Sequence, residues 1–327
     1  MIDGRRARVA MIGSGWIVPR HLAALARLER TDLVGIVARD IERAGALAAT
    51  WGGTGYDQLA SMLDEARPDV VFVCLPPDRS PAACAELIRR GIPFLTEKPL
   101  GAVAVDPERV AAALSGSRLV TAVGYQWRGL DFLPRLRHDL TERPAHLLLA
   151  RWTGPTPSPT WWRHVDESGG QVVEQATHLY DLARLLLGEA TVVAAASGRH
   201  DRSAWPDADV DDVATAIVRF DGGTLASFSN ACLLPSGVVE FDLISEGRRA
   251  TIHPDDGPTG PAWTLTIEDE AGLVVLRTGR DPYEVQAEAF LDAVAANDPG
   301  RVLSSYADAL RTDRLTRAVV AAAGSRG

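Results

Sequence analysis

The sequence contains almost no lysine. It has 34 basic residues, and only one of them, Lys98, is a lysine, which leaves 33 arginines. Arginine stays protonated at any ordinary pH, whereas the pKa of a lysine moves with its surroundings and its ammonium can transfer a proton. The single exception therefore points to chemistry at Lys98. The alternative, which remains open, is that an arginine-rich sequence kept this one lysine by chance.

The sequence also lacks basic charge, long apolar runs and paired cysteines. A net charge of −9 argues against a surface that binds nucleic acid or an anionic membrane. No apolar stretch approaches the ~20 residues of a membrane helix, and the run after the N-terminal arginines is too short for a signal peptide. Cys74, Cys84 and Cys232 do not have the spacing of metal ligands. We expect buried, reduced thiols, no metal site and a cytoplasmic protein.

Hydrophobic residues make up 46% of the 327-residue chain, which is enough for two domains with separate cores. Short apolar runs at 8–13, 33–38, 69–75, 93–98 and 118–125 alternate with stretches of helical spacing. Apolar strands separated by helices predict a parallel sheet that is covered on both faces. Residues 1–124 are therefore predicted to form a doubly wound α/β domain of the Rossmann type.

Residues 125–327 follow a different pattern. We expect one long helix over 170–187, then strands with turn signals between them over 214–230, 239–253 and 265–277. Hairpins predict a mostly antiparallel open sheet and hence an α+β domain for substrate binding and oligomerisation. The final helices, about 282–323, are expected to pack back on the first domain. An apolar sheet face predicts a homodimer or homotetramer.

A glycine-rich turn follows the first predicted strand. Gly13 and Gly15 occupy the first two positions of G-x-G-x-x-G, and Val18 replaces the third glycine. The two glycines allow a tight turn and a close approach of the backbone to a pyrophosphate at the N-terminus of the next helix. An ordinary tight turn is the alternative, but the order of strand, turn, helix and strand favours a dinucleotide site.

The end of the second predicted strand bears on the choice of dinucleotide. An NAD site usually has a carboxylate here for the ribose, whereas this sequence has Ala38 followed by Arg39. Alanine would not repel a 2′-phosphate and Arg39 could pair with it, so the sequence predicts NADP(H) over NAD(H). If the strand runs two residues longer, Asp40 becomes the ribose ligand and NAD(H) is preferred.

The predicted helix over 170–187 carries titratable groups on one face. At about 100° per residue, Gln171, Glu174, His178 and Asp181 share an arc of roughly 80°. Glu174 and His178 are i, i+4 neighbours, so the carboxylate could orient or charge the imidazole. A solvated polar face with one incidental histidine is the alternative.

At this point the sequence resembles a family. GSGWIVPRH (13–21), TEKPLG (96–101) and SGGQVVEQATHLYDLARLLLG (168–188) resemble, in order and spacing, the glucose-fructose oxidoreductase, inositol dehydrogenase and rhizopine-catabolism (Gfo/Idh/MocA) oxidoreductases. In that family the E-K-P lysine and the helix histidine handle the proton of the substrate alcohol or ketone. The resemblance implies catalytic roles for Lys98 and His178, with Glu174 in place of the family's usual aspartate, a change that shifts the charge by about 1.5 Å.

Looser matches add further candidates. GYQWR (124–128) resembles the family's G-Y-N-R-R junction, and the W-R pair at 162–163 its W-R segment. The tryptophans could stack on a sugar ring or belong to the core of the second domain. The predicted cofactor-binding residues are Gly13, Ser14, Gly15, Trp16, Ile17, Ala38, Arg39, Leu75, Pro76, Glu97, Lys98 and Gln126. The predicted substrate-binding residues are Trp127, Arg128, Trp161, Arg163 and Asp181.

The sequence therefore predicts reversible hydride transfer between NADP(H) and a hydroxyl or keto carbon of a sugar, sugar nucleotide, cyclitol or related polyol. Lys98 or His178 donates the proton and the other steadies the developing charge, and the sequence leaves open which does which. Two alternatives are an enzyme that retains its cofactor for internal redox cycling or elimination through a keto-sugar, and a non-catalytic NADP(H)-sensing regulator.

Overall fold

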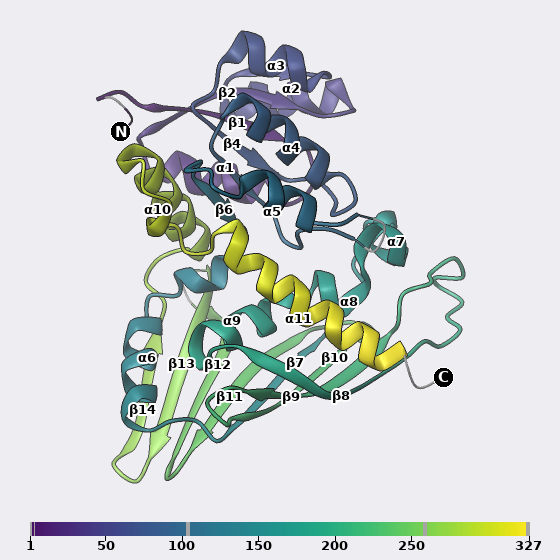
Figure 1. The fold of residues 1–327 in the computed structure, drawn as a ribbon, viewed down its shortest axis with the longest axis vertical. Helices are drawn as coiled ribbons and strands as arrows, with labels where there is room; N and C mark the ends of the chain where they lie inside the picture. The colour runs from purple at the N-terminus through teal and green to yellow at the C-terminus, as the bar shows by residue number, and fades with distance from the viewer. Residues whose placement is uncertain (1, 3, 103–104, 258–259, 325–327) are drawn as a thin grey trace. The chain divides into compact units, whose positions relative to one another are not determined.

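The computed structural model describes residues 2, 4–102, 105–257 and 260–324, and the chain divides into two compact units (Figure 1). Unit 1 comprises Met1–Gly129 and Asp281–Leu310, and unit 2 comprises Leu130–Arg280 and Arg311–Gly327. Within the described residues, no helix combines the length and the apolarity that crossing a membrane requires.

Unit 1 contains a six-stranded sheet in which all strands run parallel, in the order β3-β2-β1-β4-β5-β6. Its strands are β1 (Ala7–Ile12), β2 (Thr31–Val37), β3 (Thr54–Tyr56), β4 (Val70–Val73), β5 (Phe94–Thr96) and β6 (Thr121–Val123). This strand order, with crossovers between neighbours, is that of a doubly wound Rossmann sheet. The predicted fold class of the first domain is confirmed.

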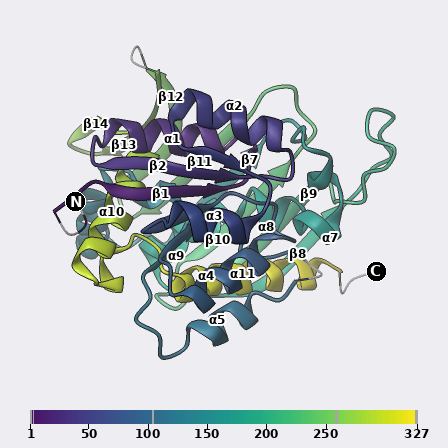
Figure 2. The same cartoon turned by 90° about the horizontal axis from the view of Figure 1, so that it is seen from above.

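Helices cover both faces of this sheet (Figure 2). They are α1 (Val18–Arg27), α2 (Ile41–Trp51) and α10 (Pro282–Ala296) on one face, and α3 (Leu59–Ala66), α4 (Ser80–Arg90) and α5 (Glu108–Leu114) on the other. Alternate side chains of β1 point to opposite faces of the sheet. Val9 and Met11 lie in the core on the side of α1, α2 and α10, and Ala10 and Ile12 lie in the core on the side of α3, α4 and α5. A strand buried on both faces is apolar throughout, which is why 9–12 reads as a continuous apolar run.

Unit 2 is built on an eight-stranded sheet in the order β14-β13-β12-β11-β7-β10-β9-β8. The strands are β7 (Leu147–Thr153), β8 (Ala190–Gly198), β9 (Val213–Phe220), β10 (Leu225–Ala231), β11 (Val238–Ser245), β12 (Arg248–Gly257), β13 (Gly260–Asp269) and β14 (Gly272–Arg277). Only the β7–β10 pair is parallel among the pairs described, so the predicted, mostly antiparallel sheet is confirmed.

One face of this sheet is covered by helices and the other is open (Figure 1). The helices of unit 2 are α6 (Leu133–Glu142), α7 (Val165–Ser168), α8 (Gly170–Glu174) and α9 (Thr177–Leu187), together with the part of α11 (Tyr306–Gly324) that begins at Arg311. On the open face Leu149 and Ile217 both lie beside Ser227 in register and are exposed.

The prediction of one regular helix over 170–187 was wrong. The helix is interrupted between α8 and α9: Ala176 N donates to Gln171 O at 2.9 Å, five residues back, and Leu179 N to Ala176 O at 2.8 Å, three residues back. A wide turn followed by a tight one changes the rotation per residue, so the assumption of a uniform angle fails here. The polar face is not solvated either, because Gln171, His178 and Asp181 are each 4% exposed or less.

The three cysteines are buried and free. Burial raises the pKa of the Cys74 and Cys232 thiols, and raises that of Cys84 to about 11. Because the thiolate is the reactive form, we predict that the native protein at about pH 8 does not react with a water-soluble disulfide reagent within minutes, and that all three thiols react after unfolding in denaturant. Rapid labelling of any cysteine in the native protein would contradict this packing.

Candidate active site

A row of backbone hydrogen bonds joins the carboxyl ends of the parallel strands in unit 1. Each bond is 2.7 to 2.8 Å long, and the donor–acceptor pairs are Gly13–Val37, Cys74–Ile12, Glu97–Val73 and Gly124–Thr96. The row places the glycine turn, the segment after β4 that holds Leu75 and Pro76, the E-K-P tripeptide and the segment before Gln126 along one edge of the sheet. Open parallel sheets bind their ligands at this edge.

The glycine turn is held tightly against β4. Gly13 has a φ of +116°, and a Cβ on it would lie 2.2 Å from the carbonyl oxygen of Cys74. At Gly15 a Cβ would meet nothing within 4 Å, so the space beyond this residue is open. Val18, at the position of the third glycine, is fully buried in the core on the α1 side.

The N-terminus of α1 is suited to an anion. Its N-cap residue, Ile17, makes no side-chain capping bond, and the first turn holds no acidic residue. The N–H groups of Val18 and Arg20 are bonded to Gly15 O and Ile17 O, and Pro19 has none, so an anion would be held by the turn before the helix and by the helix dipole. Trp16, the neighbouring residue, is 68% exposed.

At the ribose end of the predicted site, the second strand does not extend to Asp40, as it would have to for Asp40 to become the ribose ligand. β2 ends at Val37, and Ala38 N donates to Tyr56 O at 3.0 Å. Asp40 is the N-cap of α2 and accepts a hydrogen bond from Arg43 N at 3.0 Å. Arg39 is exposed. The Asp40 carboxylate is therefore already engaged in capping a helix.

Glu97 has a buried partner that the sequence analysis did not identify. Its Oε1 lies 2.7 Å from Nε2 of His21, a fully buried residue of α1. The same carboxylate packs closely against Gly124, where an added Cβ would lie 2.7 Å from Glu97 Oε2. His21 closes the quoted segment GSGWIVPRH and is the only histidine before residue 138, a signal that was present in the sequence.

The segment after Gly124 contains one suitable cofactor contact and two structural residues. The side-chain oxygen of Gln126 is buried and accepts no hydrogen bond from the described residues, so a ligand amide could satisfy it. Trp127 is only 5% exposed. Arg128 Nη1 donates to Leu303 O at 3.0 Å and pairs with Asp308 at 2.5 Å. Trp127 and Arg128 thus serve the packing of unit 1, and their predicted contact with substrate gains no support.

In unit 2, His178 is the second residue of α9. Its ring stacks on Trp152 of β7, with centroids 6.0 Å apart and an interplanar angle of 24°. Glu174 Oε2 accepts a hydrogen bond from Nε1 of the fully buried Trp162 at 2.8 Å. Glu174 therefore fixes the tryptophan segment to α8. Its predicted role in orienting His178 stays a prediction.

Asp181 belongs to a buried polar network. Thr312 Oγ1 donates to Asp181 Oδ1 at 3.0 Å and accepts from Arg184 Nη1 at 2.7 Å. Arg184 also pairs with Glu189 at 2.6 Å. Asp181 is 1% exposed, so this carboxylate holds α9 to α11, and its predicted contact with substrate gains no support.

The tryptophan segment before α7 is also held by local contacts. The guanidinium of Arg163 lies 3.7 Å from the ring centroid of Trp205, and its Nη1 lies 3.7 Å from Asp207. Trp162 forms a small core with Val210 and Cys232, and Trp161 packs against its edge. Trp162 therefore belongs to the core of the second domain, which was the alternative to stacking on a sugar ring.

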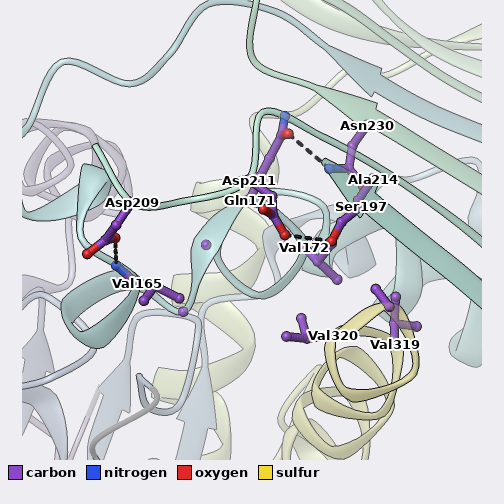
Figure 3. Close-up of a pocket in the computed structure, with 13 residues that line it drawn as sticks. Val165, Gln171, Val172, Ser197, Asp209, Asp211, Ala214, Asn230, Val319 and Val320 are labelled. Carbon is purple, nitrogen blue, oxygen red and sulfur yellow. Dashed lines mark hydrogen bonds between the residues drawn. The ribbon is translucent and has the colours of Figure 1, made fainter. Parts of the chain in front are cut away.

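A cavity of about 80 Å³ lies at the start of α8 (Figure 3). Inside it Gln171 Oε1 accepts from Asn230 at 2.9 Å, and Ser197 donates to Asp211 at 2.6 Å. Valines of α8 and α11 form its apolar wall. His178 and Glu174 are not among its lining residues, so it is separate from the catalytic candidates.

Comparison with known proteins gives two family matches within this chain. A family described as "Oxidoreductase family, NAD-binding Rossmann fold" matches residues 7–125. A second, described as "GFO/IDH/MocA C-terminal domain", matches residues 145–257. The two matches fall on the two segments that carry the parallel and the antiparallel sheet.

Individual proteins match over nearly the whole chain. A dTDP-3,4-didehydro-2,6-dideoxy-alpha-D-glucose 3-reductase from Streptomyces violaceoruber is 27% identical over 333 residues, covering 98% of this chain and 96% of the reductase. The structure of a 3-ketoreductase from Actinomadura kijaniata, in complex with NADP and TDP-benzene, has a TM-score of 0.83 at 21% identity and covers 97% and 98% of the two chains. A UDP-N-acetylglucosamine 3-dehydrogenase from Acidithiobacillus ferrooxidans has a TM-score of 0.81 at 22% identity, with 98% of both chains covered.

Substitution of the two glycines of the turn is predicted to affect different properties, stability at Gly13 and dinucleotide binding at Gly15. Gly13→Ala places a Cβ 2.2 Å from a backbone oxygen at a positive φ, so we expect unfolding to become easier by about 2 kcal/mol or more. Gly15→Ala has room within the protein and should fold normally, but its methyl enters the space predicted for pyrophosphate and should weaken dinucleotide binding. Thermal unfolding and fluorescence titration measure the two effects. Equal stability of both variants would contradict the tight contact at Gly13.

Proposed function

The chain belongs to the Gfo/Idh/MocA family of oxidoreductases, and on that basis we propose that it transfers a hydride between NADP(H) and a hydroxyl or keto carbon of a sugar nucleotide or related polyol. The observation that carries the proposal is the position of Lys98. The only lysine of the chain lies two residues after the end of β5, at the carboxyl edge of the parallel sheet.

The residues of unit 1 fit the dinucleotide. The glycine turn from Gly13 to Ile17, at the N-terminus of α1, would hold the pyrophosphate. Arg39 would pair with a 2′-phosphate, and this assignment is supported by the engagement of Asp40 in capping α2. Gln126 would accept a hydrogen bond from the carboxamide of the nicotinamide. A bound nicotinamide supplies or accepts the hydride.

Lys98 and His178 are assigned the proton. In the reduction direction a positioned N–H group gives a proton to the oxygen of the carbonyl as that oxygen gains charge, and in the oxidation direction the same group takes the proton back. Lys98 can do this because an ammonium can lose its proton, which a guanidinium does not do at ordinary pH. His178 is the other candidate, because an imidazole changes charge close to neutral pH.

The substrate class is inferred from the relatives. The matched proteins are named as a reductase of a dTDP-linked keto-sugar, a 3-ketoreductase and a dehydrogenase of a UDP-linked amino sugar. An inositol 2-dehydrogenase from Rhizobium meliloti is 26% identical over 230 residues, covering 68% of each chain. A carbon that alternates between hydroxyl and ketone is common to these names, and two of the four specify a sugar linked to a nucleotide.

A second copy of the chain is proposed to cover the open face of the unit 2 sheet. Leu149, Ile217 and Val238 are exposed there by 42%, 47% and 43%. Exposed apolar side chains on an open sheet face favour association over contact with water.

Lys98→Arg tests the proton role. The charge is preserved but proton transfer is blocked, so we expect kcat to fall about 100-fold or more. Because Lys98 is also a predicted cofactor contact, the Kd for NADPH is measured separately and kcat is taken at saturating NADPH. The assay follows NADPH absorbance with a panel of keto-sugars and sugar nucleotides. Turnover close to wild type in this variant would contradict the role of Lys98.

Arg39→Ala tests the choice of dinucleotide. Loss of a charged hydrogen bond to the 2′-phosphate should raise the Kd for NADPH about tenfold and leave the Kd for NADH within about twofold. Arg109→Ala, at an exposed position of α5, is the control and should alter neither value. Fluorescence titration of nucleotide-stripped protein gives both constants. An equal effect on NADPH and NADH would remove Arg39 from the site.

A further inference from the structure

His21 is the only histidine in the ranges 1–129 and 281–310 that make up unit 1. It is fully buried on α1. Its ring is held between two aromatic side chains: the centroid of Phe72 on β4 lies 5.5 Å away, and that of Tyr283 on α10 lies 5.3 Å away at an edge-on angle of 84°. The imidazole is therefore fixed by packing and cannot turn without displacing one of these rings.

The hydrogen bonding of the ring assigns its tautomer. Nε2 lies 2.7 Å from Glu97 Oε1, whereas Nδ1 is buried and has no partner among the described residues. A proton on Nδ1 would be a buried donor without an acceptor, which is costly. The arrangement that avoids this cost has the proton on Nε2, from which it is donated to the Glu97 carboxylate.

The other charged and titratable groups around the pair are few. Arg20 lies over the Tyr283 ring at 5.1 Å and within 3.7 Å of Asp281. Burial raises the pKa of Tyr283, and burial followed by the charge of Glu97 raises that of Cys74. Of the hydrogen bonds described at the Glu97 carboxylate, the one from His21 is the only one from another side chain.

Glu97 is thus held at two points. Its backbone N–H is bonded to Val73 O, and its side chain is fixed between His21 and Gly124. Lys98 is the next residue in the chain. The direction in which the Lys98 side chain leaves the backbone therefore depends on how Glu97 is held.

We propose that His21 is a positioning residue for the reaction: by donating to Glu97 it ties α1, whose N-terminus is the predicted pyrophosphate site, to the tripeptide that presents Lys98. This inference rests on the proposed function, because Lys98 is the proton-transferring candidate there. His21 does not contact substrate in this account and acts only through Glu97.

A matched pair of variants isolates the Nε2–H bond. In His21→Gln the side-chain amide reaches the place of Nε2 and can donate to Glu97. In His21→Asn the amide reaches only the place of Nδ1, and in His21→Leu no donor remains. His138→Leu, at an exposed histidine of α6, is the control. The Gln and Asn pair carries the test if His21→Leu does not fold.

The first readout is steady-state kinetics with thermal unfolding. We expect kcat to fall about tenfold or more in the Asn and Leu variants, with KM and the Kd for NADPH within about threefold, and the Gln variant to keep most of its kcat. A purely structural role would lower the melting temperature in proportion to the loss of packing and leave kcat per folded molecule unchanged. That outcome would overturn the proposal.

The second readout needs neither cofactor nor substrate. Because Lys98 is the only lysine, acylation of the apoprotein by an amine-reactive ester, followed by peptide mass spectrometry, reports on this side chain alone apart from the N-terminus. We expect the rate at Lys98 to change about threefold or more in the Asn and Leu variants and to stay at the wild-type value in the Gln variant and in His138→Leu. Equal rates in all variants would overturn the proposal.

The two readouts separate the proposal from the proposed function. Altered acylation in a protein that turns over no keto-sugar would support the positioning role of His21 and contradict the assigned reaction. Turnover that is equal in wild type, His21→Gln and His21→Asn would support the reaction and contradict the role of His21.

Discussion

The carboxyl edge of the parallel sheet is the constraint on which the candidate site depends. Backbone hydrogen bonds from Gly13, Cys74, Glu97 and Gly124 to the neighbouring strands fix these residues in one row, regardless of their separation in sequence. The row is so close-packed that Gly13 and Gly124 have no space for a side chain. The roles proposed for the glycine turn and for Lys98 require positions fixed to within fractions of an ångström, which only such a rigid support provides.

Each unit fixes its catalytic candidate through buried polar contacts. In unit 1 His21 holds Glu97 beside Lys98. In unit 2 the bond from Trp162 to Glu174 holds α8, and the network around Thr312 holds α9, the helix that carries His178. Buried polar groups are stable only when they are hydrogen-bonded, so these contacts specify one arrangement of the helices. Several residues that look like ligands in the sequence are used in this way.

Periodicity predicted the folds of both units because each kind of strand has a distinct pattern: apolar throughout where two faces are covered, as in 9–12, and alternating where one face is open, as in β9. It failed at Gln175 and Ala176, since an irregular turn depends on tertiary packing rather than on local composition. The partners of Asp181, Arg128 and His21 lie 131, 180 and 76 residues away in sequence. No local pattern contains such pairings, and so the sequence could name candidate residues without separating anchors from ligands.

The most direct test of the account is the fate of the nicotinamide hydrogen. NADPH that carries deuterium at the transferable position would be incubated with the protein and a panel of keto-sugar nucleotides, and the products would be analysed by mass spectrometry. The account predicts a product that retains the deuterium on the carbon where the ketone became a hydroxyl. Unlabelled product, or no product from a protein that binds the nucleotide, would contradict it.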